Sequence, residues 1–232
     1  MNKSPENILQ EINVKFDSNF KECLKNNKED LSRLFLYLRG IAETGEILKS
    51  KGQLKHHEKC CLILDEVFSD IVTAIYLASV AIDQPANIVM RRALELGIST
   101  IYLWDMPHAL YSWESHGLNL SFNEMVTHIN SAGYKSYVEN EIGSKLEEEL
   151  IPTKFVGAYY SEFSDIVHGK LTSFESNLSK RFSFCYEDWS KFVSKCEEVS
   201  GLLLTCYIKR FQIKVDLLER IPALKQKYGA GV

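Results

Sequence analysis

The sequence predicts an all-α protein, built as a single-domain helical bundle of about seven to nine helices. Apolar residues recur every three or four positions along most of the chain, which is the period of a helix with one buried side. Residues typical of helix starts and stops punctuate these stretches. Because no internal repeat or linker interrupts the chain, we expect one domain over residues 1–232, with its core at about 28–220 and an N-terminal helix at 1–27.

The first half of the chain carries four predicted helices. Ser4-Pro5-Glu6 is typical of a helix start, and the helix that follows is expected to reach about residue 27. The next two helices are expected at about 29–49 and 54–82, and a fourth, with Pro85 in its first turn, ends before Pro107. The stretch 71–82 is apolar on nearly every side, which favours a central position for the third helix.

The second half predicts shorter elements and one long helix. Residues 107–117 form a short helix or turn closed by Gly117, and residues 121–124 fit a capping box that opens another helix. An amphipathic helix is expected over 134–149, followed by one that Pro152 opens and Gly169 ends. Residues 171–186 are interpreted as a structured loop, and a last helix runs from about 187 to 220.

Composition excludes several classes of protein. The formal net charge of -4 and the pI of about 5.9 argue against a protein that binds nucleic acid through overall positive charge, so such binding requires a local patch. The most apolar run, Ile71 to Ile82, is too short to cross a bilayer. Six cysteines without disulfide-scaffold spacing favour reduced thiols. We therefore expect a cytoplasmic protein without a membrane segment.

A polar stripe runs along the otherwise apolar fourth helix. Arg92 and Glu95 lie on it, followed by Ser99 and Tyr102 at helical spacing. Burying charged side chains costs free energy unless each charge has an opposite charge or hydrogen bonds beside it. Two interpretations stay open: a structural ion pair that links helices, or a pocket in which Arg92 or Arg91 binds an anion and Glu95 orients a partner.

A second polar line lies in the stretch YYSEFSDIVHGK, where Tyr160, Ser164 and His168 recur every four residues. A histidine titrates near neutral pH and can act as a general acid or base, with Asp165 fixing its tautomer. The alternative is a histidine that only benefits from the dipole at a helix C-terminus. If the two polar lines face each other, they form one pocket, in which Arg91, Tyr160 and Ser164 are binding candidates.

The segments MRRALELGISTIYLW and YYSEFSDIVHGK resemble a group of bacterial all-α proteins that looks like an offshoot of the HEPN superfamily. The resemblance covers about residues 55–215. It implies a metal-independent endoribonuclease that acts as a homo-oligomer on RNA or a nucleotide, with Arg92, Glu95, Ser164 and His168 at the matching positions. His168 would take a proton from a ribose 2′-hydroxyl, and Arg92 would stabilise phosphate charge. The sequence departs from the family because no arginine has a histidine five positions later on one helix.

Other patterns predict weaker alternatives. In HHEKCC, His56 and Cys60, like His57 and Cys61, are spaced to share a metal on one helix face, but no second pair completes a zinc site. Asp-x-x-His occurs at 105–108 and 165–168, a spacing similar to that of di-metal bundles. The aromatic cluster within 104–116 fits a core, an interface or base stacking. We assign no metal and no cofactor.

Two functions therefore follow from the sequence. The first is a HEPN-like toxin or effector in bacterial antiviral defence that cleaves RNA with Arg92, Glu95 and His168. The second is a non-catalytic helical interaction module, either a homo-oligomer or an accessory subunit of a larger defence complex. In the second case, the acidic segment 139–150 and the aromatic cluster would form the contact surface.

Overall fold

The computed structural model describes residues 4–143, 145–146, 148–170 and 182–213, and every regular element in these ranges is helical, as the sequence predicts. The elements in chain order are α1 (Pro5–Asn26), α2 (Lys28–Lys51), α3 (Lys55–Ser79), α4 (Asp83–Asp105), α5 (Pro107–Ser115), α6 (Phe122–Ile129), α7 (Ala132–Tyr137), the π-helical turn η1 (Val138–Ile142), α8 (Thr153–Val167) and α9 (Tyr186–Phe211). In this part of the chain no helix combines the length and apolar composition that a bilayer crossing requires.

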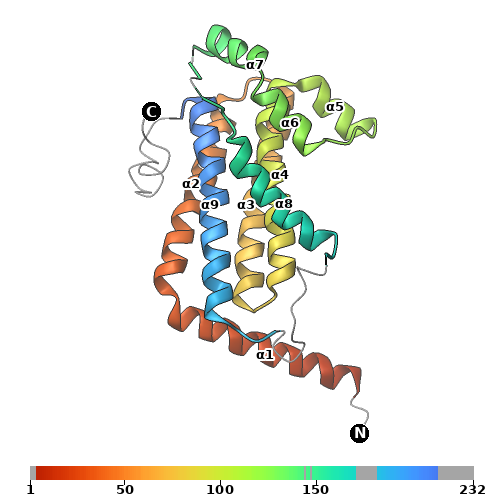
Figure 1. The fold of residues 1–232 in the computed structure, drawn as a ribbon, viewed down its shortest axis with the longest axis vertical. Helices are drawn as coiled ribbons and strands as arrows, with labels where there is room; N and C mark the ends of the chain where they lie inside the picture. The colour runs from red at the N-terminus through yellow and green to blue at the C-terminus, as the bar shows by residue number, and fades with distance from the viewer. Residues whose placement is uncertain (1–3, 144, 147, 171–181, 214–232) are drawn as a thin grey trace.

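The long helices α2, α3, α4 and α9 run side by side along the long axis, and α8 crosses α4 at an angle (Figure 1). Helix α1 lies across one end of this bundle, whereas α5, α6 and α7 gather at the other end. The side-chain amide of Asn19 fixes α1, because it donates to the carbonyl of Val80 at 3.0 Å and to that of Phe182 at 2.9 Å. The buried apolar side chains form a single cluster that extends from Cys23 to Ile213.

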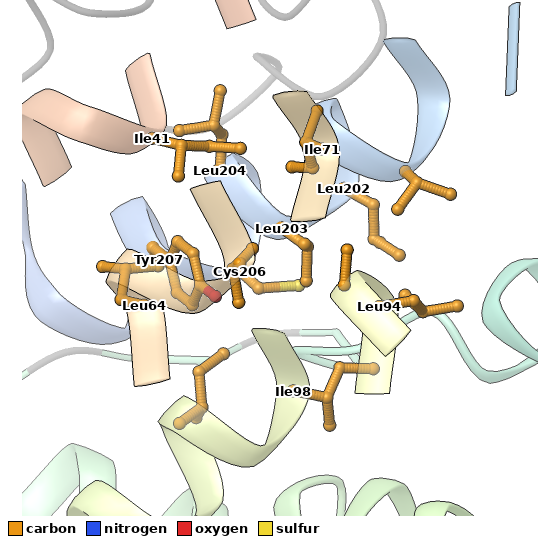
Figure 2. Close-up of a cluster of buried hydrophobic side chains, with 14 of the residues drawn as sticks. Ile41, Leu64, Ile71, Leu94, Ile98, Leu202, Leu203, Leu204, Cys206 and Tyr207 are labelled. Carbon is orange, nitrogen blue, oxygen red and sulfur yellow. The ribbon is translucent and has the colours of Figure 1, made fainter. Parts of the chain in front are cut away.

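Helix α9 is the centre of the bundle. All residues from Val199 to Ile208 are buried, so this stretch has no solvent-facing side. Leu202, Leu203 and Leu204 point in different directions, toward side chains of α2, α3 and α4 (Figure 2). The third helix, expected to be central, packs against α1, α2, α4 and α9, but Leu62, Val72 and Tyr76 keep one of its sides exposed.

Residues that the sequence predicts at helix starts and stops take these positions in the structure. Ser4 accepts a hydrogen bond from the backbone N–H of Asn7, and Pro5 occupies the first turn of α1. Ser121 accepts from the backbone N–H of Glu124 at the start of α6. Gly117 and Gly169 adopt φ values of 69° and 61°, in the left-handed region. This conformation often ends a helix, and glycine adopts it at the lowest cost in free energy.

Two predicted helix ends are wrong. The helix expected over 134–149 stops much earlier, because the backbone turns left-handed at Gly143, where φ is 76°. This turn brings Leu150 and Ile151 back into the core. The last helix ends at Phe211 rather than 220, because Gln212 adopts a left-handed conformation. The interpretation of 171–186 as a loop lies mostly outside the described residues, and α9 already begins at Tyr186.

The closest approach of α4 and α9 depends on a glycine. A Cβ atom at Gly97 would lie 2.5 Å from Leu203 Cδ2, and Leu203 is fully buried. At the same level the hydroxyl of Tyr207 donates to the carbonyl of Gly97 at 2.9 Å. Only a residue without a side chain allows both contacts.

We predict that Gly97→Ala lowers the free energy of unfolding by about 1–3 kcal/mol, because the new methyl group overpacks the α4–α9 contact. The matched control is Gly157→Ala in α8, where no atom lies within 4 Å of the added Cβ. There, alanine should raise stability by about 0.5–1 kcal/mol through its higher helix propensity. Urea unfolding of both variants measures the difference, and equal stability changes would contradict the close packing.

Candidate functional site

The two neighbouring arginines of α4 contact different helices. The guanidinium of Arg91 pairs with Glu95 one turn later at 3.0 Å and donates to the hydroxyl of Tyr160 in α8 at 3.0 Å. Arg92 instead pairs with two acids of α3, at 2.5 Å from Asp70 and 2.9 Å from Glu66. The expected charged pair of Arg92 with Glu95 is therefore replaced by the pair Arg91–Glu95, and Arg92 links α4 to α3.

Tyr160 lies between a cation and an aromatic ring. The Arg91 guanidinium carbon is 4.8 Å from the centre of the Tyr160 ring, and the ring of Phe122 from α6 stacks on Tyr160 at 4.0 Å. Cation–π and stacking contacts of this kind contribute about 0.5–1.5 kcal/mol each. This cluster, Arg91–Glu95–Tyr160–Phe122, joins α4, α6 and α8, and each of its polar groups has a partner within it.

The side chains of the remaining predicted site residues make no bond to a side chain of this cluster within the described ranges. The hydroxyl of Ser164 donates to the carbonyl of Tyr160 in its own helix at 2.6 Å. His168 caps the C-terminus of α8 and is exposed, and its neighbour Asp165 pairs with Lys170 at 2.5 Å. No hydrogen bond or ion pair within the described ranges joins the His168 imidazole to Arg92 or Glu95. The catalytic roles of Arg92, Glu95 and His168 stay predictions.

The residues of the HHEKCC motif are engaged in packing. His56 Nε2 lies 3.0 Å from the carbonyl oxygen of Trp104, and the imidazole of His57 stacks on the Trp104 ring at 3.9 Å. Burial, with repulsion from His56 as a second cause, lowers the pKa of His57 to about 4. Burial also raises the pKa of the Cys60 thiol to about 12. Among the described residues no group of three or more His, Cys, Asp or Glu is arranged to hold a metal ion.

Among the described residues, the most deeply buried ion pair joins two residues that the sequence analysis did not pair. Arg210 of α9 and Asp105 at the end of α4 are 105 positions apart, and their side chains are only 5% and 4% exposed. The Nε and Nη2 atoms of Arg210 both donate to the Asp105 carboxylate, Nε at 2.8 Å. This is the two-point geometry that makes an arginine–carboxylate pair strong.

Two tyrosines complete this pair. The hydroxyl of Tyr134 donates to Asp105 Oδ2 at 2.7 Å and accepts from Arg210 Nε at 3.0 Å. The hydroxyl of Tyr137 donates to Asp105 Oδ1 at 3.2 Å. Burial, followed by the nearby charge of Asp105, raises the pKa of the Tyr134 phenol, so Tyr134 stays a hydrogen-bond donor. The signal available in the sequence was a charged residue inside each of two apolar segments, Asp105 after Trp104 and the pair Lys209-Arg210 before Phe211.

Hollows lie on both sides of the Asp105–Arg210 pair. One, of about 210 Å³, is lined by Asp105, Met106, His128, Gly133, Tyr134 and Tyr137. The other, of about 350 Å³, is lined by Lys51, Gln53, Leu54, His57, Trp104, Ile142, Arg210, Phe211 and Gln212. Because four helix ends meet around the second hollow, backbone carbonyls and polar side chains border it. We call the second hollow the Arg210 hollow.

An apolar trough follows the surface between α2 and α3. Its first part, of about 280 Å³, is lined by Leu31, Leu34, Phe35, Leu38, Arg39, Ala42, Phe68, Val72 and Ile75. Its second part, of about 460 Å³, is lined by Ile41, Ala42, Glu43, Gly45, Glu46, Ile47, Leu64, Asp65 and Phe68. Ala42 and Phe68 border both parts, so the trough is continuous. We call this surface the α2/α3 trough.

Comparison of the chain with protein-family models, with curated proteins and with solved structures finds no match. The functional conclusions below therefore depend on the residues and their geometry. The three features that carry chemistry or binding are the Arg91–Glu95–Tyr160–Phe122 cluster, the Asp105–Arg210 pair with its hollows, and the α2/α3 trough.

We predict that Asp105→Asn lowers the free energy of unfolding by about 3–5 kcal/mol, because the charge of Arg210 stays buried without a counter-charge. Adding Arg210→Met to Asp105→Asn should recover much of this loss, since both buried charges are then gone. The control is Asp17→Asn, which removes the exposed ion pair of Asp17 with Lys21 and should cost less than about 1 kcal/mol. Equal losses for Asp105→Asn and Asp17→Asn in urea unfolding would contradict the buried pair.

Proposed function

We propose that this protein is a non-catalytic helical interaction module, and that its α2/α3 trough binds a second copy of the chain. The observation that carries the proposal is the trough itself, a continuous apolar surface on which Phe35 is 65% exposed and Val72 is 41% exposed. Contiguous exposed apolar surface of this kind marks interaction sites in folded proteins, whereas single exposed apolar residues do not.

The charges along the trough are self-complementary. Its first part is bordered by the cation of Arg39, and its second part by the carboxylates of Glu43, Glu46 and Asp65. Within one chain Arg39 pairs with Glu43 at 2.8 Å, and Lys49 pairs with Glu46 at 3.1 Å and with Asp65 at 3.4 Å. A two-fold axis near Ala42, which borders both parts, sets Arg39 of one copy opposite Glu46 of the other. Two-fold dimers use the same patch on both subunits, so ion pairs between the copies replace these exposed pairs within one chain.

The polar cluster around Arg91 also supports an interaction module over an enzyme. Arg91, Glu95 and Tyr160 are bonded to one another, and Arg92 is bonded to Glu66 and Asp70. A catalytic site requires groups that are positioned to bind and transform a substrate, whereas these bonds hold the charged groups within the fold and leave Asp70 Oδ2 as their one buried oxygen without a partner among the described residues. This pattern favours the structural ion pairs that the sequence left open as one interpretation.

The protein should run as a particle of twice the chain mass of 26.6 kDa, and Phe35→Asp should convert it into a monomer. The reason is that the new carboxylate is buried without a partner in the apolar interface. The control is Val14→Asp on α1, where the valine is 68% exposed and lies outside the trough. Light scattering during size-exclusion chromatography measures both masses at equal concentration.

Charge reversal gives a stricter test of the same interface. Arg39→Glu should weaken the dimer, and the double variant Arg39→Glu/Glu46→Lys should restore it. Either of two results would overturn the proposal. The wild-type chain is monomeric at micromolar concentration, or it is a dimer that Phe35→Asp and Arg39→Glu leave intact.

RNA cleavage is the second candidate, supported by the resemblance to HEPN proteins and by two accessible groups. The side chain of Arg92 is 51% exposed, and His168 is exposed at the end of α8. In this alternative the protein is a cytoplasmic toxin or effector of antiviral defence, or a subunit of a larger defence complex, in which Arg92, Glu95 and His168 cleave RNA without a metal.

Single-stranded RNA incubated with the protein and a chelator separates the two candidates. Cleavage by the wild type that is lost in His168→Ala and kept in His116→Ala, a change at another exposed histidine, supports the enzyme. Intact RNA in every sample supports the interaction module.

A further inference from the structure

The Arg210 hollow has a chemical character different from that of the α2/α3 trough. It is formed where the C-terminal ends of α2, α4 and α9 meet the beginning of α3. Two cationic side chains line it, Lys51 and Arg210, and none of the described residues that line it is an aspartate or glutamate. The second part of the trough, by contrast, has three carboxylate side chains in its lining.

Arg210 is held rigidly at the wall of this hollow. Its Nε and Nη2 atoms donate to Asp105 and Tyr134, which fixes the plane of the guanidinium. A guanidinium has five N–H donors, and the two hydrogens of Nη1 have no acceptor among the described residues. A cation that is 95% enclosed and already oriented loses little conformational entropy when it binds an anion.

Lys51 is fixed at the same opening. Its ammonium group donates to the carbonyl oxygens of Phe211 at 2.7 Å and Gln212 at 3.4 Å, at the C-terminus of α9. An ammonium has three donor hydrogens, so one is left for a ligand. The side-chain amides of Gln53 and Gln212 add further polar groups to the lining, and Gln212 donates to the carbonyl of Ile142 at 3.1 Å.

The remaining wall of the hollow is aromatic and apolar. The rings of Trp104 and Phe211 meet edge to face at 5.1 Å, and Leu54 and Ile142 lie beside them. His57 extends this wall, because its ring is stacked on Trp104 with 6° between the planes. Burial lowers the pKa of His57, so this part of the wall is uncharged at neutral pH. A volume of about 350 Å³ lies at the lower end of the range for small-molecule sites.

We propose that the Arg210 hollow binds a small organic anion that carries one carboxylate or phosphate group on a flat apolar body. The anionic group contacts Lys51 and Arg210, and the flat body packs against Trp104 and Phe211. The Lys51 ammonium supplies the positive charge of such a site, and Arg210, whose own charge is balanced by Asp105, adds the N–H donors of Nη1. Together they hold the anionic group against the opposing dipoles of the three helix C-termini, and the aromatic wall gives selectivity over inorganic anions. This site is independent of the dimer proposed at the α2/α3 trough.

The test titrates the full chain at pH 7.5 and constant ionic strength with benzoate, phenyl phosphate, benzamide and inorganic phosphate. Calorimetry, or ligand-observed NMR for weak binding, measures the affinities. We expect benzoate or phenyl phosphate to bind, and to bind at least tenfold more tightly than benzamide and inorganic phosphate. Which of the two organic anions binds more tightly identifies the preferred anionic group.

Two matched variants locate the site. Gln53→Glu adds a negative charge at an exposed position in the lining and should weaken binding at least tenfold, whereas Gln10→Glu adds the same charge on exposed α1 and should leave affinity unchanged. Thermal unfolding of both variants verifies that the fold is kept. Three results would overturn the proposal. Benzoate and benzamide bind equally, the two variants have equal affinity, or neither organic anion binds at millimolar concentration.

Discussion

Helix α9 has no side that faces solvent between Val199 and Ile208, so other helices must cover it from every direction. Helix α2 lies along one side, α4 along another, and α3 reaches it between them. The contact with α4 is close at Gly97, where Leu203 fills the space that any larger residue would occupy. Burial of apolar side chains on α9 contributes about 1.5–3 kcal/mol for each large residue, so this helix is a major source of stability.

The buried charges follow from the same arrangement. Arg210 lies in the last turn of α9, where the helix is still almost fully enclosed, and it therefore requires a buried counter-charge. Asp105 meets this requirement because α4 ends at the same level, and Tyr134 and Tyr137 satisfy the remaining carboxylate lone pairs. The pair thus fixes α7 against the ends of α4 and α9, and it sets the cationic wall of the Arg210 hollow.

Sequence periodicity was sufficient for the all-α fold and for most helix starts, because caps such as Ser4 and Ser121 act locally. The helix over 134–149 was mispredicted because its acidic residues are compatible with a helix. The turn at Gly143 depends instead on the burial of Leu150 and Ile151, and Leu150 contacts Cys206 of the distant helix α9. The end of α9 at Phe211 depends in the same way on Lys51, which binds the last carbonyl groups from another helix.

The candidate sites were predicted less completely for a related reason. Arg91 and Arg92 are adjacent on one helix, and their different partners are decided by the positions of α8 and α3, which periodicity does not give. Asp105 and Arg210 are separated by 105 positions, so no local pattern connects them. The interaction surfaces we propose depend likewise on helices brought together by the fold around α9.

Native-state hydrogen exchange measures the central role of α9 most directly. Amide protons exchange through local openings or through complete unfolding, and only the most deeply packed elements require the latter. We expect the amides of 199–208 to exchange with a free energy equal to that of global unfolding in urea, while amides in the first turns of α1 exchange at much lower free energy. Exchange of 199–208 at a free energy well below that of global unfolding would contradict a bundle organised around this helix.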